Sequence, residues 1–385
     1  YANNLLLFSA FSLFFHYLSL LLQANIHYLI LMHITLVAGA RPNFIKLAPI
    51  IWATINAKRN GKDISYTLIY TGSENDPTVE DDLFEQLEIP HPDVFLGVDC
   101  ESINELTGRV MSAFDHYLDT VDTDTVIVCD DLASTMAVAI VSKKRGKRLA
   151  HLVAGTRSFD INMPKEINRL VIDGLSDLMF TAGVSANSIA TREGAEQNKI
   201  YMVGNLLIDT LRNNYSRFSR PKCIDGIDKY FVLTINRKAL ISDSAYIENM
   251  VAAIEKEASD IPVIAPLHPL AAKAISPLLS ESSPIRIVDS LSYLEFGYLT
   301  SHALGIITDS GNVAEEATFN TVPCITLNDY TEHIETVSIG SNTLVGSNTM
   351  LLRSTIADII AGKYKRSAIP DRWDGRTAER ILQSL

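Results

Sequence analysis

The stretch that says most about the fold of this chain is ALGIITDSGNVAEE, from Ala303 to Glu316. Its apolar first half, residues 303–308, is typical of a buried strand, and the corner at Ser310 and Gly311 leads directly into a helical pattern. The first N–H groups of a helix have no internal partner and lie at the positive end of its dipole, so such a corner binds anions. Glu316 falls about one turn further on, where a carboxylate can accept hydrogen bonds from sugar hydroxyls. The stretch predicts a nucleotide or nucleotide-sugar site, with a plain strand, turn and helix carrying a solvated glutamate pair as the alternative.

Short apolar runs alternate with longer amphipathic stretches on both sides of this corner. That alternation is typical of a parallel sheet with helices on both faces. The polar stretch 213–228 has no clear period and separates two such series. We therefore expect an α/β fold of two Rossmann-like, doubly wound domains that face a central cleft, where ligands of such folds bind. The expected strands are Ile34–Ala38, Ser65–Tyr70, Thr125–Cys129, Leu149–Val153, Leu178–Thr181 and Ile200–Val203, then Tyr230–Thr234, Val263–Pro266, Ile285–Val288, Leu304–Thr308 and Cys324–Leu327, with helices such as Phe44–Ala57 and Ala133–Lys144.

Length and composition agree with two globular domains. The chain has 385 residues, of which 47% are hydrophobic and 20% charged, and this length exceeds one ordinary core. A net charge of −12 argues against a nucleic-acid-binding surface, so an anionic ligand needs a local cluster of cations and helix N-termini. The four cysteines are far apart in the sequence, which argues against a zinc knuckle or a disulfide framework and favours a cytoplasmic setting.

The first residues need a separate interpretation. Residues 5–31 contain no Lys, Arg, Asp or Glu and are long enough to span a bilayer as a helix. However, no Lys or Arg occurs before Arg41, so a signal-peptide n-region and a positive flank are both missing. We therefore expect residues 1–31 to be a leader outside the native fold, with no membrane partner. The expected domains are then 32–207 and 208–365, with a C-terminal helix within 366–385 that packs back on the first domain.

Four further segments carry a specific signal. They are GARPNFIKLAP at 39–49, HLVAGTRS at 151–158 with PKEINR at 164–169, VGN at 203–205 with ID at 208–209, and the corner at 309–316 with TEH at 331–333. Together, in this order and at these separations, they resemble the non-hydrolysing UDP-N-acetylglucosamine 2-epimerase family. The resemblance runs from Met32 almost to the C-terminus.

The resemblance implies a GT-B-type pair of domains, with UDP held mainly by the second and the sugar across the cleft. Members of the family interconvert UDP-N-acetylglucosamine (UDP-GlcNAc) and UDP-N-acetylmannosamine (UDP-ManNAc). They eliminate UDP to leave an enzyme-bound 2-acetamidoglucal and add it back on the other face, and they require neither a nicotinamide cofactor nor a metal. The resemblance also implies a homodimer that supplies precursors for surface polysaccharides.

Matching positions give the expected site residues. The catalytic candidates are Asp131, Arg169 and His151. For Asp131 the alternative is a helix cap, for Arg169 with its neighbours Glu166 and Asp173 a solvated helix face, and for His151 a satisfied core histidine. The expected substrate-binding residues are Arg41, Lys46, Ser310 and Gly311 near the diphosphate, Glu316 on the ribose hydroxyls, and Asn236, Arg237 and His333. His268 is added because it stands at the end of a second-domain strand, where it can meet a nucleotide.

The sequence departs from the family pattern at several positions. Val153 replaces the glutamate of Glu-Ala-Gly, Lys165 the first glutamate of Pro-Glu-Glu, and Asn236 the histidine of Gly-His-Arg. In addition, His333 stands where many members have an arginine, and Cys129-Asp130-Asp131 replaces His-Gly-Asp. A general acid or base contributes roughly 10²–10⁴-fold in rate, so nucleotide binding is expected to be better preserved than chemistry. The leading hypothesis is a UDP-sugar epimerase that uses Asp131; the alternatives are a UDP-sugar-binding protein without turnover, or another GT-B enzyme such as a transferase or hydrolase.

Overall fold

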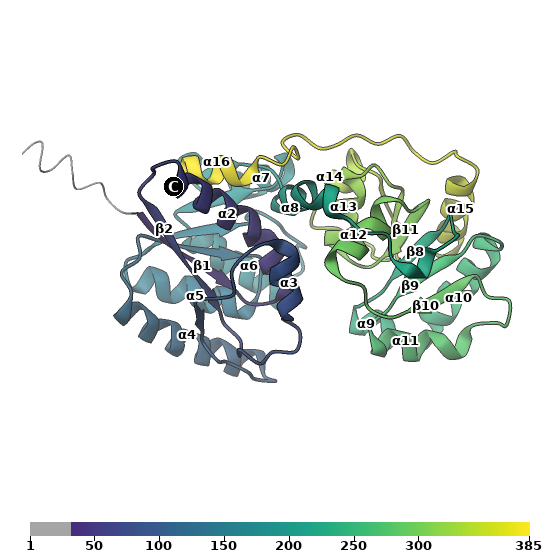
Figure 1. The fold of residues 1–385 in the computed structure, drawn as a ribbon, viewed down its shortest axis with the longest axis horizontal. Helices are drawn as coiled ribbons and strands as arrows, with labels where there is room; N and C mark the ends of the chain where they lie inside the picture. Colours follow the sequence, from purple (N-terminus) through teal and green to yellow (C-terminus); the bar gives the residue numbers. More distant parts are fainter. Residues whose placement is uncertain (1–31) are drawn as a thin grey trace, which may run out of the picture.

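The computed structural model describes residues 32–385, so the expectation for residues 1–31 lies outside the described part of the chain. Figure 1 shows two lobes side by side, each built on one sheet with helices on both faces. The first sheet has the strand order β3-β2-β1-β4-β5-β6-β7 and the second the order β10-β9-β8-β11-β12-β13. Neighbouring strands are parallel throughout both sheets. The predicted α/β class with two Rossmann-like domains of GT-B type is confirmed.

The elements follow each other in regular strand–helix alternation. Those of the first lobe are β1 (Met32–Ala38), α2 (Arg41–Arg59), β2 (Ile64–Tyr70), α3 (Asp81–Leu87), β3 (Val94–Phe95), α4 (Ile103–Thr120), β4 (Thr125–Cys129), α5 (Ala133–Lys144), β5 (Arg148–Leu152), α6 (Pro164–Leu175), β6 (Leu178–Thr181), α7 (Val184–Arg192), β7 (Ile200–Met202), α8 (Leu206–Asn214) and α16 (Thr377–Ser384). Those of the second lobe are β8 (Phe231–Thr234), α9 (Lys238–Ile241), α10 (Ser244–Ala258), β9 (Val263–Pro266), α11 (Pro269–Ile275), β10 (Ile285–Val288), α12 (Tyr293–Ser301), β11 (Gly305–Thr308), α13 (Gly311–Phe319), β12 (Cys324–Thr326), α14 (Glu335–Ser338), β13 (Asn342–Leu344) and α15 (Thr349–Ile360).

Every strand expected from the sequence is present, with some ends moved by one or two residues. Two edge strands, β3 and β13, were not predicted. The expectation that Val153 ends a strand is wrong, because β5 ends at Leu152 and Val153 turns away with φ +67°. Apolar side chains pack on both faces of each sheet, which explains the continuous hydrophobic runs in the central strands.

Two helices connect the lobes. The predicted division at 207/208 falls inside α8, which packs against α2 of the first lobe and α13 of the second. After α15 the chain crosses back over the second lobe, and α16 packs on α2 of the first lobe (Figure 1). Within residues 32–385 no helix is both long and apolar enough to cross a membrane.

Trp373 fixes this returning segment. Its side chain is 2% exposed, and its Nε1 donates to the carbonyl oxygen of Ala182 at 3.0 Å. Truncating a buried tryptophan to alanine costs about 3–5 kcal/mol, so Trp373→Ala should lower the thermal midpoint clearly and release the C-terminal helix to limited proteolysis. Trp373→Phe, which keeps most of the packing, should lose much less. An unchanged midpoint in the alanine variant would show that the segment is not needed for stability.

Candidate active site

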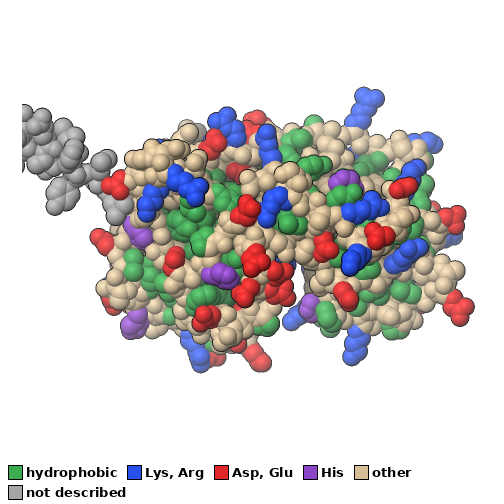
Figure 2. All heavy atoms as spheres, in the orientation of Figure 1, with side chains coloured by type: hydrophobic (Ala, Val, Ile, Leu, Met, Phe, Trp, Pro, Cys, Tyr) green, Lys and Arg blue, Asp and Glu red, His purple; other side chains and the backbone are tan. Residues whose placement is uncertain are grey.

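A cavity of about 350 Å³ lies between the two lobes, at the carboxyl ends of the strands. Figure 2 shows the surface hollowed between the lobes, with acidic side chains gathered along the edge of the first. Ligands of doubly wound folds bind at this end of the sheet, and the volume is within the range of small-molecule sites. The cavity is lined by Ala40, Pro42, Asn43, Lys46, Asp130, Asp131, Leu132, His151, Val153, Thr156, Lys165 and Arg169 from the first lobe, and by Asn236, Arg237, Asp309, Ser310, Gly311, Asn312, Glu332 and His333 from the second.

The second lobe contributes the predicted anion corner. Helix α13 begins at Gly311, with Ser310 as its N-cap and no acidic side chain in its first turn. Asp309, 2% exposed, accepts hydrogen bonds from the backbone N–H groups of Asn236 at 2.8 Å and Arg237 at 2.6 Å. It therefore ties the loop after β8 to the corner after β11. This geometry presents backbone donors and a positive helix end to the cavity.

The side chains of Arg237 and His333 flank this corner. The guanidinium of Arg237 lies 5.4 Å from the ring centre of Tyr330 and donates to its hydroxyl at 3.2 Å. His333 places Nδ1 3.1 Å from Oε1 of Glu315, a residue that is 2% exposed. Burial raises the pKa of Glu315, although His333 and Lys46 oppose this shift.

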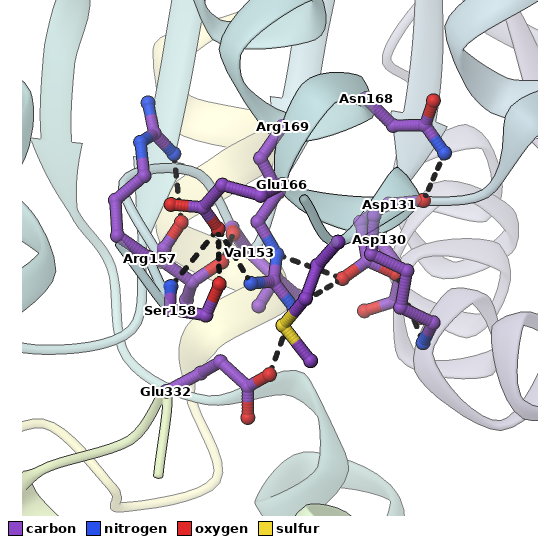
Figure 3. A network of polar contacts seen from close by, with 12 residues as sticks. Asp130, Asp131, Val153, Arg157, Ser158, Glu166, Asn168, Arg169 and Glu332 are labelled. Carbon is purple, nitrogen blue, oxygen red and sulfur yellow. Dashed lines mark hydrogen bonds and ion pairs between the residues drawn. The ribbon is translucent and has the colours of Figure 1, made fainter. Parts of the chain in front are cut away.

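In the first lobe, Arg169 is the centre of an ionic network (Figure 3). It is 4% exposed, and its Nε donates to Oδ2 of Asp131 at 2.8 Å. Its Nη1 donates to Glu166 at 2.9 Å, and its Nη2 reaches Glu332 of the second lobe at 3.0 Å. The alternative of a solvated helix face is therefore wrong, and Arg169 joins the two walls of the cavity.

Asp131 is committed to this network. It does not cap the following helix, because the N-cap of α5 is Leu132 and no side chain caps it. Burial favours the neutral form of Asp131, but Lys165 and Arg169 outweigh burial and lower its pKa. Asp131 is therefore held as a carboxylate, which makes it a poor proton donor near neutral pH.

A second ion pair lies beside the first. Nζ of Lys46 is 2.5 Å from Oδ1 of Asp130, and Nδ2 of Asn43 donates to Oδ2 of Asp130 at 2.8 Å. Burial alone would lower the pKa of Lys46, but the Asp130 carboxylate outweighs it and raises that pKa. Lys46, predicted near the phosphates, thus lines the cavity with its ammonium group paired to Asp130.

His151 is 1% exposed and has both ring nitrogens engaged. Nδ1 lies 2.6 Å from Oδ1 of Asp173, and Nε2 lies 3.0 Å from the carbonyl oxygen of Asp130. The Asp173 carboxylate and the Asp130 carbonyl thus give each ring nitrogen a polar partner. This arrangement fits the alternative of a satisfied buried histidine, and the catalytic role of His151 stays a prediction.

Three predicted residues do not line the cavity, and their roles stay predictions. Arg41 begins α2 between the lining residues Ala40 and Pro42. His268 is exposed and accepts from the backbone N–H of Leu270 at 3.3 Å, so it caps α11. Glu316 is 8% exposed, and its carboxyl has no hydrogen-bond partner in the part of the chain that the structure describes. Asp130, Glu315 and Glu332 all lie in segments quoted from the sequence, but none of them was predicted as a site residue.

The buried Glu316 predicts a pH effect on stability. Burial, followed by the charge of Glu315, raises the pKa of Glu316 from 4.5 to about 8. In the unfolded chain this carboxyl ionises near pH 4.5, whereas in the folded protein it stays protonated up to about pH 8. The free energy of unfolding therefore falls as the pH rises from about 4.5 to about 8, and Glu316 lowers it no further above that pH. A tenfold change in proton affinity corresponds to about 1.4 kcal/mol. The thermal midpoint of Glu316→Gln relative to wild type should therefore be several degrees higher at about pH 8 than at about pH 5.5. An equal difference at both pH values would show that Glu316 ionises normally.

Comparison with known proteins points to one family of enzymes. A family model described as UDP-N-acetylglucosamine 2-epimerase matches residues 56–385. A UDP-N-acetylglucosamine 2-epimerase of Methanocaldococcus jannaschii is 36% identical, over 92% of this chain and 99% of its own. A UDP-2,3-diacetamido-2,3-dideoxy-D-glucuronate 2-epimerase of Pseudomonas aeruginosa is 32% identical, over 82% of this chain and 89% of its own.

Solved structures show the same architecture. The M. jannaschii UDP-GlcNAc 2-epimerase, in complex with UDP-GlcNAc and UDP, superposes with a TM-score of 0.79 at 32% identity and covers 91% of this chain and 99% of its own. The UDP-GlcNAc 2-epimerase of Neisseria meningitidis bound to UDP-GlcNAc gives a TM-score of 0.83 at 25% identity, over 92% of this chain and 99% of its own. On the extent of the family match and the identity to the M. jannaschii relative, this chain belongs to the UDP-N-acetylglucosamine 2-epimerase family.

Proposed function

We propose that this protein is a UDP-sugar 2-epimerase that interconverts UDP-GlcNAc and UDP-ManNAc by eliminating UDP and adding it back. The observation that carries the proposal is the cavity between the lobes. It sets the N-terminus of α13 and Arg237 on one wall against the Asp131–Arg169 and Asp130–Lys46 pairs on the other. One wall suits a diphosphate, and the other suits the sugar carbon that exchanges a proton.

The reaction places two demands on the cavity. Loss of the proton at sugar carbon C2 and cleavage of the C1–O bond give 2-acetamidoglucal and free UDP. The electron pair of the broken bond leaves on the β-phosphate, so preorganised donors around that phosphate lower the barrier. Ser310, Gly311 and Arg237 are the residues we assign to this task, together with His333. Arg41 stays a further candidate for the diphosphate and Glu316 a candidate for the ribose.

On the wall that we assign to the sugar, the carboxylates are paired with cations. Arg169 contacts both Asp131 and Glu332 across the cleft, and together with Lys165 it lowers the pKa of Asp131. We assign Arg169 to positioning these carboxylates and Asp131 to contact with the sugar. Return of the proton to the opposite face of C2, followed by attack of the β-phosphate on C1, gives the epimer.

Product formation tests the proposal directly. The protein is incubated with UDP-GlcNAc alone, in the presence of EDTA and without a nicotinamide cofactor, and the UDP-sugars are separated by chromatography. We expect UDP-ManNAc to accumulate, and a reaction started from UDP-ManNAc to reach the same final ratio. UDP binding without interconversion in either direction would instead support a UDP-sugar-binding protein.

Lys165 favours a second substrate for the same chemistry. Its side chain is 60% exposed and lines the cavity, with Nζ 3.3 Å from Asp131. An ammonium group at this place suits a sugar with an additional carboxylate, such as the uronate on which the P. aeruginosa relative acts according to its name. A higher kcat/KM for the UDP-linked diacetamido uronate than for UDP-GlcNAc, lost in Lys165→Gln, would identify it as the preferred substrate.

We also propose that the protein works as a homodimer in the cytoplasm and supplies surface polysaccharide precursors. The family resemblance supports this assignment. Light scattering of the purified protein tests the dimer, and an observed monomer would contradict it.

A further inference from the structure

Two neighbouring residues at the cavity edge have a strained backbone. Asp130 and Val153 follow the ends of β4 and β5, which are paired in parallel with Cys129 opposite Leu152. The two residues are therefore next to each other, one strand apart, and both line the cavity. Their φ angles are +61° and +67°, in the left-handed region that favours glycine. Such strain persists where the surroundings impose it, and it concentrates at functional sites.

The surroundings of Asp130 hold its carboxylate in one place. Lys46 contacts one oxygen at 2.5 Å and Asn43 the other at 2.8 Å. Asn43 is itself fixed, because its Oδ1 accepts from the backbone N–H groups of Gly39 at 2.8 Å and Ala40 at 3.2 Å. The Asp130 side chain nevertheless keeps 17% of its surface exposed, on the cavity side of the pair. It is therefore a fixed carboxylate with free lone pairs toward the cavity.

The other cavity carboxylates have different tasks. Asp131 and Glu332 share the guanidinium of Arg169, and Asp309 accepts from the backbone of the β8 loop. Asp130 contacts no arginine within residues 32–385. A proton taken up by Asp130 leaves the positive charge of Lys46 in place and disturbs no contact between the lobes. Of the four, Asp130 is the carboxylate best placed to change its protonation during a reaction.

We propose that Asp130 is a catalytic residue that exchanges the proton at C2 of the sugar, and that it provides there the carboxylate absent at its neighbour Val153. This rests on the proposed epimerase function. Asp130 takes the C2 proton, the C–H electrons form the C1=C2 double bond, and the C1–O electrons leave with UDP. Another group returns a proton from the opposite face, and UDP adds back to C1 as the double-bond electrons take up that proton.

Removing the carboxylate at position 130, and then placing one at position 153 instead, tests this proposal. Asp130→Asn removes the acid–base function and keeps the shape, so the initial rate of UDP-ManNAc formation should fall about 100-fold or more. UDP affinity, measured by calorimetry, should stay within about threefold. Asp130→Gly should lose the same activity, and because glycine adopts the φ of this position without strain, it offsets part of the stability lost with the Lys46 ion pair. In the double variant Asp130→Gly/Val153→Glu the carboxylate moves one strand over, and we expect it to recover at least tenfold of the rate lost in Asp130→Gly.

A matched control separates this role from the general loss of an ion pair. Asp177 pairs with Lys143 at 2.7 Å in the same lobe but does not line the cavity, so Asp177→Asn should keep wild-type activity. Wild-type turnover in Asp130→Asn would overturn the proposal and leave the proposed function standing. A double variant that folds and binds UDP but recovers no activity would also overturn the proposal for Asp130. A wild-type protein that binds UDP but forms no epimer from any UDP-sugar tested would overturn both.

Discussion

Arg169→Met is expected to lower the rate of epimerisation at least 100-fold and to reduce stability markedly. The substitution keeps an extended side chain but leaves the carboxylates of Asp131, Glu166 and Glu332 without their shared cation. Breaking a buried ion pair by removing one partner costs about 3–5 kcal/mol. In addition, Asp131 and Glu332 then repel each other across the cleft, so the two walls of the cavity are no longer held together by a shared ion pair.

Arg169→Lys is the matched control for this prediction. It retains one positive charge but cannot contact three carboxylates in the planar geometry of a guanidinium. We expect it to recover most of the thermal midpoint and little of the activity. Activity within about twofold of wild type in Arg169→Met would show that Arg169 serves neither positioning nor catalysis.

Glu316→Ala is expected to weaken UDP binding by more than tenfold without unfolding the protein. Buried polar groups are nearly always hydrogen-bonded, yet the Glu316 carboxyl lacks such a partner among residues 32–385. Ribose hydroxyls would supply one, and hydrogen bonds to a charged group contribute about 1.5–3 kcal/mol. Binding of the ribose would also favour the ionised form of Glu316, so UDP binding should release fewer protons in the variant than in the wild type.

Glu316→Gln distinguishes a hydrogen bond from simple packing. It keeps the size of the side chain and one acceptor oxygen, so it should lose less affinity than Glu316→Ala. Calorimetric titration with UDP measures both variants. An unchanged dissociation constant in Glu316→Ala would remove Glu316 from the nucleotide site.

The sequence predicted local features well. The corner at Ser310 and Gly311 was recognised because a buried strand, a small-residue turn and a helix have a local signature. Strand β13 was missed because its first residue, Asn342, is polar yet 0% exposed. Its side chain is satisfied inside the protein, since Oδ1 accepts from the hydroxyl of Thr326 at 2.7 Å. Hydrophobic patterning cannot reveal a buried polar residue whose partner lies on another strand.

Contacts between distant segments were not predictable from the same patterns. Arg169 reaches Glu332, Asn205 donates to Glu315 at 2.8 Å, and the backbone of Ser185 donates to Glu335 at 2.8 Å. Each contact joins the first lobe to the second, so each depends on how the lobes pack. For the same reason, sequence comparison showed the loss of a carboxylate at Val153 but did not show that Asp130 lies beside it.

Deuterium incorporation tests the central claim, proton exchange at C2 of a UDP-sugar, most directly. The protein is incubated with UDP-GlcNAc in deuterated water, and the UDP-sugars are examined by NMR and mass spectrometry. We expect one deuterium at C2 of the UDP-ManNAc that forms and also in UDP-GlcNAc recovered as equilibrium is approached. UDP-GlcNAc that binds with measurable affinity but shows no exchange at C2 would contradict epimerase chemistry on this substrate.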